Sequence, residues 1–163
     1  MTNAIICDTS VWLYLGFLGQ SGLLHQLYEA VYTTEAVCRE LDNGRINRPD
    51  IFDPRQVSQV HVVQADLSDI SGLPANRLGL GERSVLAYAR RHQIRIVGLD
   101  DRQARELALH MNLQVVGTVG LLIRAKQAGL IEAVRPLLVQ LQAEGFRIGQ
   151  EPFEYALTKA KET

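Results

Sequence analysis

The chain has 163 residues, of which 47% are hydrophobic and 21% are charged, with a formal net charge of −1. One domain of this length buries enough apolar surface to fold without a metal or disulfide staple, and the near-neutral charge argues against a general polyanion binder. No apolar run approaches the ~20 residues that span a bilayer, and no basic residue precedes the first apolar run, as one would in a signal peptide.

The first expected element is a buried strand over the apolar run 4–7, which ends at Asp8. Thr9 or Ser10 could cap the helix that follows, and Asp8 itself could have only that capping role. In open parallel sheets, however, ligands bind just outside the carboxyl ends of the strands. Asp8 therefore stands where chemistry is expected, and the same apolar run contains Cys7.

Helical and extended patterns then alternate along the chain. Further strands are expected around 32–34, 57–65, 94–99 and 113–116, and a short extended segment at 146–148. Helical spacing covers 11–16, 23–31, 35–41, 82–92, 102–110, 119–128, 131–144 and 151–161, and the polar stretch 42–56 predicts a mobile loop. This order predicts a three-layer α/β/α sandwich with a central parallel sheet, formed as a single domain over 1–163.

The two cysteines, Cys7 and Cys38, both lie in apolar patterns. We interpret them as small buried hydrophobic residues of a cytoplasmic protein, and not as a disulfide or a pair of metal ligands.

Acidic residues fall at corresponding positions of this predicted architecture. Asp8 ends the first strand, Glu40 lies in the last turn of one helix, Glu82 opens another, and Asp100-Asp101 ends a later strand. Each has an ordinary explanation, since Glu82 suits the dipole of a first turn and Asp101 could be an N-cap. Together they predict a carboxylate cluster that repels itself unless a cation is bound, and oxygen ligands without His or Cys favour Mg²⁺ or Mn²⁺.

The order of these motifs resembles that of the PIN-domain nucleases, and more narrowly a branch related to VapC-type toxins. The resemblance covers nearly the whole chain and rests on the motifs Asp8-Thr9-Ser10, Val37-Cys38-Arg39-Glu40-Leu41, Leu80-Gly81-Glu82, Leu99-Asp100-Asp101 followed by Ala104-Arg105, the stretch Val116-Gly117-Thr118-Val119-Gly120-Leu121-Leu122, and Gly145-Phe146-Arg147-Ile148.

The resemblance implies a Mg²⁺- or Mn²⁺-dependent ribonuclease that cleaves single-stranded RNA, inhibited by a small antitoxin protein and commonly a homodimer. Asp8 and Asp101 would bind metal directly, with Asp100 close by, and Glu40 and Glu82 would complete the shell. Such metals orient phosphate and activate water for in-line hydrolysis.

The same resemblance implies supporting roles for other polar residues. The hydroxyl residues Thr9, Ser10 and Thr118 match family positions near the site. Arginines that could hold the RNA backbone, or could equally be ordinary surface charges, are Arg45, Arg48, Arg83, Arg102 and Arg105.

Two other functions remain open from the sequence. A phosphoacceptor signalling domain also gathers acids at strand ends, but its acidic pair follows the first strand, whereas here the pair Asp100-Asp101 comes late and Thr118 follows the next strand without a lysine. A catalytically weak PIN-like module for binding or assembly is the alternative to the nuclease.

Overall fold

The computed structural model describes residues 3–163, which form five strands and eight α-helices. All strands pair in parallel, in the order β3-β2-β1-β4-β5. The strands are β1 (Ala4–Cys7), β2 (Ala30–Thr34), β3 (Val60–Val63), β4 (Ile96–Gly98) and β5 (Gln114–Val116). The predicted parallel sheet is therefore confirmed, with β1 at its centre.

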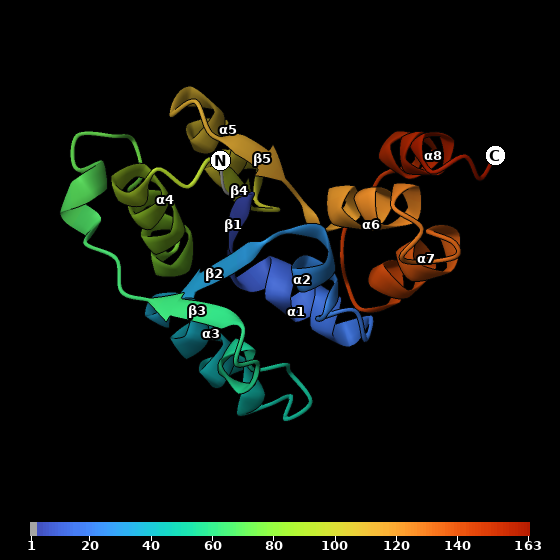
Figure 1. Ribbon diagram of the computed structural model, residues 1–163, viewed down its shortest axis with the longest axis horizontal. Coiled ribbons are helices and arrows are strands. Elements are labelled where there is room, and N and C mark those ends of the chain that lie inside the picture. Colours follow the sequence, from blue (N-terminus) through green and yellow to red (C-terminus); the bar gives the residue numbers. More distant parts are fainter. Residues whose placement is uncertain (1–2) are drawn as a thin grey trace.

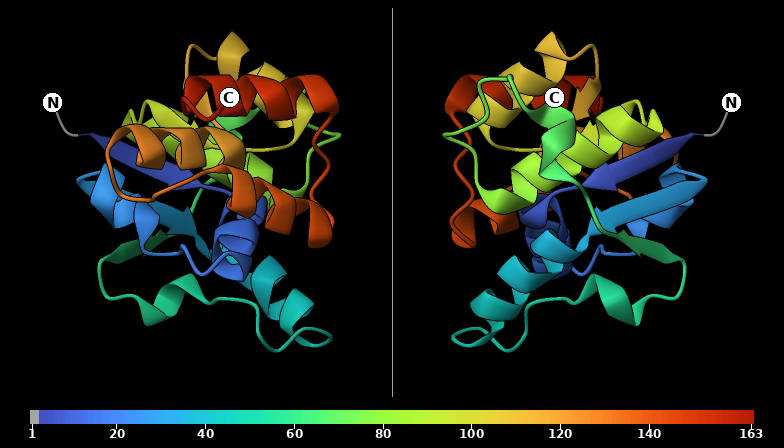
Figure 2. Two further views of the ribbon diagram at one scale, coloured as in Figure 1. Left: turned by 90° about the vertical axis from the view of Figure 1, so that its right-hand side faces the viewer. Right: turned by 90° about the vertical axis from the view of Figure 1, so that its left-hand side faces the viewer.

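Helices cover both faces of the sheet (Figure 1). Helix α4 lies on one face, where it contacts β1, β2 and β4, whereas α1, α2 and α6 lie on the other (Figure 2). The helices are α1 (Thr9–Phe17), α2 (Leu23–Leu27), α3 (Glu35–Arg45), α4 (Leu80–His92), α5 (Arg102–His110), α6 (Thr118–Gln127), α7 (Arg135–Ala143) and α8 (Gln150–Lys159), with short 3-10 helices η1 (Pro54–Gln56) and η2 (Leu67–Ile70). This arrangement is the expected α/β/α sandwich.

The central strand is buried from both sides. Ile5, Ile6 and Cys7 have no solvent exposure, and neither do Trp12 and Leu15 of α1. Burial on two faces explains why β1 is a continuous apolar run and does not alternate with polar residues.

The strand register places the carboxyl ends of the central strands at one edge of the sheet. Cys7 pairs with Gly98 and Ile6 with Tyr32, so β1, β2 and β4 end side by side. Helix α3 begins directly after β2 and contacts α1 and α4, which lie on opposite sides of the sheet. Side chains of α3 therefore reach the edge at which the central strands end.

Several elements differ from the sequence-based expectation. Helix α3 continues to Arg45, so Glu40 lies mid-helix and not in a last turn. Asp42, within this extension, accepts hydrogen bonds from both Arg45 and Arg55. Val31, expected in a helix, belongs to β2 and pairs with Val60. The predicted helix over 131–144 begins only at Arg135, and 146–148 joins no strand pair.

No helix among residues 3–163 is both long and apolar enough to cross a membrane.

Candidate metal and active site

Asp8 is the most deeply buried acid at the edge where the central strands end. Its backbone N–H donates to Gly98 O at 3.0 Å, which fastens the end of β1 to the end of β4. Although Asp8 occupies the N-cap position of α1, its side chain makes no capping hydrogen bond. Only 4% of the residue is exposed, and its Oδ1 has no hydrogen-bond partner among the described residues. The capping role therefore does not explain this carboxylate.

The surroundings of Asp8 disfavour its negative charge. Burial raises its pKa from 3.8 to about 8; the neighbouring Thr9 partly offsets this shift, and the carboxylates of Glu82 and Glu40 add to it. A buried carboxylate with an unpaired oxygen and two acidic neighbours is a site that a cation would stabilise.

Glu40 reaches Asp8 from α3 and is held by two donors. Thr9 Oγ1 donates to Glu40 Oε1 at 2.5 Å, and the backbone N–H of Gly81 donates to Oε2 at 3.0 Å. A Cβ atom at Gly81 would lie 2.5 Å from Glu40 Oε1 and 3.1 Å from Asp8 Oδ1. The absence of a side chain at Gly81 therefore leaves room for both carboxylates at the start of α4.

Glu82 and Asp101 lie at the N-termini of two helices, α4 and α5. Glu82 Oε1 accepts from the N–H of Gly79 at 3.0 Å, and Asp101 Oδ2 accepts from the N–H of Ala104 at 3.0 Å as the N-cap of α5. Burial raises the pKa of Glu82, and the charges of Asp101 and Glu40 raise it further. Glu82 is thus electrostatically linked to Asp101 on one side and to Asp8 on the other.

Asp100 is held by hydroxyl and backbone donors from two other elements. Its Oδ2 accepts from Ser10 Oγ at 3.0 Å and from Thr118 Oγ1 at 2.7 Å, while Oδ1 accepts from Thr118 N at 2.7 Å. Thr118 is completely buried. The predicted hydroxyl residues therefore all contact a carboxylate: Thr9 contacts Glu40, whereas Ser10 and Thr118 contact Asp100.

A buried hydroxyl pair that the sequence analysis missed positions the start of α4. Thr34 Oγ1 and Ser84 Oγ are 2.7 Å apart, and Ser84 Oγ donates to Gly81 O at 2.6 Å. Thr34 also caps α3 by accepting from Val37 N. The sequence signal is a hydroxyl residue at a strand end, which by itself does not reveal the partner on α4.

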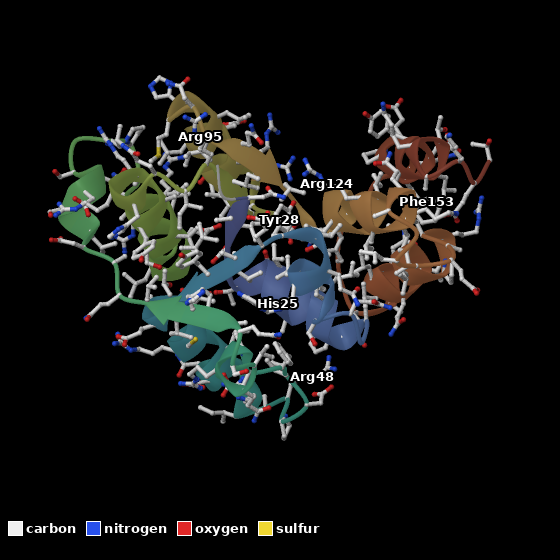
Figure 3. The ribbon with its side chains drawn as sticks, in the orientation of Figure 1. His25, Tyr28, Arg48, Arg95, Arg124 and Phe153 are labelled. Atoms are coloured by element: carbon white, nitrogen blue, oxygen red, sulfur yellow. The ribbon has the colours of Figure 1, made fainter. Side chains whose placement is uncertain are left out.

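Two of the predicted RNA-binding arginines stabilise the segment that follows α3. Arg45 contacts Asp42 and donates to the carbonyls of Ile51 and Phe52 at 3.3 and 3.2 Å. Arg48 pairs with Asp50 at 2.7 Å and with Glu144 at 3.0 Å (Arg48 is labelled in Figure 3). Both guanidinium groups are therefore engaged in intramolecular contacts.

The other three predicted arginines differ in their surroundings. Arg83 is half-buried, and its Nε has no hydrogen-bond partner among residues 3–163. Arg102 is exposed and pairs with Glu106 at 3.2 Å, while Arg105 Nη1 donates to Leu99 O at 3.2 Å, directly before Asp100. Arg105 is thus the predicted arginine with a direct contact beside the acidic edge.

Cys7 lies immediately below this edge and remains a thiol. Burial, followed by the charges of Asp8 and Asp100, raises its pKa well above the usual range. Cys7 and Cys38 are both free and buried, as expected from their apolar surroundings.

The donor set fits a hard divalent cation, although the carboxylates do not stand as a preformed cage. No group of three or more His, Cys, Asp or Glu side chains in the described part of the chain has the arrangement of a metal site. Protein donors already hold Glu40, Glu82 and Asp100. The unpaired Oδ1 of Asp8 and the oxygen-only chemistry of its neighbours nevertheless match the preference of Mg²⁺ and Mn²⁺.

A family model described as a PIN domain matches residues 4–162, which include every acidic residue considered above. A search of curated proteins found no match.

Proposed function

Because this chain belongs to the PIN-domain family, a nuclease fold, we propose that it is a Mg²⁺- or Mn²⁺-dependent endoribonuclease that cleaves single-stranded RNA. The observation that carries the proposal is the unpaired, buried Oδ1 of Asp8, whose carboxyl pKa is raised to about 8 beside Glu40 and Glu82. Stability alone does not account for such a group, because burying an unpaired carboxylate costs free energy.

Asp8 and Asp101 are the proposed direct ligands, and Glu40 and Glu82 complete the shell. Electrostatic coupling supports this set, since Glu40 and Glu82 raise the pKa of Asp8, and Asp101 raises that of Glu82. A bound divalent cation supplies polarisation of a phosphate and activation of water. We propose that Asp100, held by Ser10 and Thr118, fixes the shape of the site beside these ligands.

The direct test is RNA cleavage with Mg²⁺ or Mn²⁺ by the wild type, Asp8→Asn and the matched control Asp50→Asn, which changes an exposed acid paired with Arg48. We expect Asp8→Asn to lose cleavage and the control to retain it. Equal cleavage by the wild type and Asp8→Asn would show that Asp8 has no role.

A second pair of variants separates the two adjacent acids. Asn caps a helix about as well as Asp, so Asp101→Asn keeps the start of α5 while removing the negative charge. We expect Asp101→Asn to weaken Mn²⁺ binding, measured by calorimetric titration. If Asp101→Asn binds Mn²⁺ with full affinity and Asp100→Asn loses Mn²⁺ binding, the metal ligand is Asp100 and not Asp101.

The narrower likeness to VapC-type toxins leads us to propose that the chain is the toxin of a toxin–antitoxin pair, acts in the cytoplasm and forms a homodimer. Co-purification with the product of a small adjacent reading frame, and light scattering of the purified chain, test these proposals. A monomer without such a partner would contradict them.

The second candidate is a catalytically weak PIN-like binding or assembly module. The observation that favours it is that no metal cage is preformed among residues 3–163. A ligand that binds the native state must stabilise it, so a melting temperature unchanged by Mn²⁺ would favour this module over the nuclease.

A further inference from the structure

A groove of about 670 Å³ opens beside the acidic edge, between the α5–β5 side of the sheet and helices α6 and α8. Asp100 and Gly117 are among its lining residues, so the groove adjoins the candidate active site. Figure 3 shows Arg124 where α6 faces the α5–β5 side.

The groove carries more positive than negative charge. Four arginines line it against two acids, Asp100 and Glu106, and Glu106 is already paired with Arg102. Arg147 forms no ion pair within residues 3–163, and Arg124 Nη1 contacts only the neutral hydroxyl of Tyr28, at 3.3 Å. Arg147 and Arg124 are therefore available to an anionic ligand.

Between these charges the surface is apolar and partly aromatic. Val119, Ile123 and Ile148 contribute aliphatic surface, and Tyr155 of α8 is 61% exposed. An exposed aromatic ring in a groove lined by arginines is a combination that suits single-stranded nucleic acid, with bases on the ring and phosphates at the guanidinium groups. A duplex fits this chemistry poorly, because its bases are stacked and paired inside.

We propose that this groove binds the stretch of single-stranded RNA next to the cleaved bond, with one base stacked on Tyr155 and phosphates held by Arg147 and Arg124. This proposal rests on the nuclease function proposed above and adds the path of the substrate. It gives helix α8 a role in substrate binding, although α8 contributes none of the acidic residues of the site.

The test measures binding of a short fluorescein-labelled single-stranded RNA in EDTA, where no cleavage occurs, and of the same sequence as a duplex. Tyr155→Ala should weaken single-strand binding roughly 5- to 150-fold, the range for loss of one stacking ring, and Tyr155→Phe should bind like the wild type. Arg147→Gln should reduce the slope of log affinity against log salt by about 0.7, the value for one phosphate contact in a single strand.

Arg95→Gln is the matched control, because Arg95 lies just before β4 at the opposite end of the strands (Figure 3). Its affinity and salt slope should equal those of the wild type. Wild-type affinity in Tyr155→Ala, or a duplex bound as tightly as the single strand, would overturn the proposal.

The two proposals fail separately. Single-strand binding that depends on Tyr155, without cleavage in Mn²⁺, would refute the nuclease and keep the groove as a binding site. If the wild type cleaves RNA, and Tyr155→Ala and Arg147→Gln bind and cleave RNA as well as the wild type does, only the proposed role of the groove is refuted.

Discussion

Replacing Asp8 with asparagine should stabilise the metal-free protein near neutral pH. The native environment raises the pKa of Asp8 from 3.8 to about 8, so at pH 7 the native carboxyl is largely protonated while the unfolded one is ionised. The native state therefore binds more protons, and its stability falls as pH rises from ~4 toward ~8. At about 1.4 kcal/mol per pH unit, this single group lowers the free energy of unfolding by roughly 4 kcal/mol at pH 7.

The assay is urea unfolding of wild type and Asp8→Asn in EDTA between acidic and neutral pH. The difference in unfolding free energy should grow with pH in favour of the variant, by roughly 4 kcal/mol between pH ~4 and pH 7. Any cost of burying the new amide is the same at every pH and leaves this slope unchanged. If the unfolding free energies of the wild type and Asp8→Asn change with pH in parallel, the raised pKa assigned to Asp8 is refuted. Added Mn²⁺ should then stabilise the wild type alone.

Three further substitutions test the surroundings of the site. Thr118→Val removes a buried hydroxyl donor to Asp100 and should cost about 1.5–3 kcal/mol in urea unfolding, with Thr118→Ser recovering most of it; an unchanged midpoint would contradict the hydrogen bond. Gly81→Ala would ordinarily favour a helix by roughly 0.5–1 kcal/mol, but its Cβ would crowd Glu40 Oε1. We therefore expect a lower melting temperature and a smaller rise of that temperature on adding Mn²⁺. A stabilised variant with the full rise would disprove this crowding. Arg48→Ala should leave RNA cleavage unchanged, because its ion pairs are exposed and intramolecular; a large loss of cleavage would restore Arg48 as an RNA contact.

The sheet and its acidic edge could be predicted because they depend on local patterns and on a general property of parallel strands. Apolar runs that end in Asp8 and Asp100 predicted two strands with neighbouring carboxyl ends, and the register of β1 with β4 bears this out. Val31 was misassigned because its spacing from Leu27 also suits a helix, whereas it lies in β2, paired with Ile5 of β1 and Val60 of β3. Periodicity alone does not separate these two cases over a few residues.

The environment of each carboxylate was beyond sequence reasoning. Whether an acid caps a helix depends on where its side chain points: Asp101 does so, whereas Asp8 at an equivalent position does not. The groove was missed for a related reason. Arg124, Arg147 and Tyr155 belong to different segments with no motif in common, and only the packing of α8 against α6 brings them to one surface.

The order of the strands also fixes when the site can form during folding. Ser10 and Asp100 are 90 residues apart in the chain, and the sheet inserts β1 between β2 and the later strand β4. A growing polypeptide therefore carries Asp8 from the beginning, but it acquires Asp100 and Asp101 only after three further strands have been made, and Thr118 only after a fourth. We expect contacts of such wide sequence separation to form late in folding. A chain that stops short of β4 contains Asp8, Glu40 and Glu82 but lacks Asp100 and Asp101. Nascent chains are therefore without the assembled site until most of their length has been synthesised.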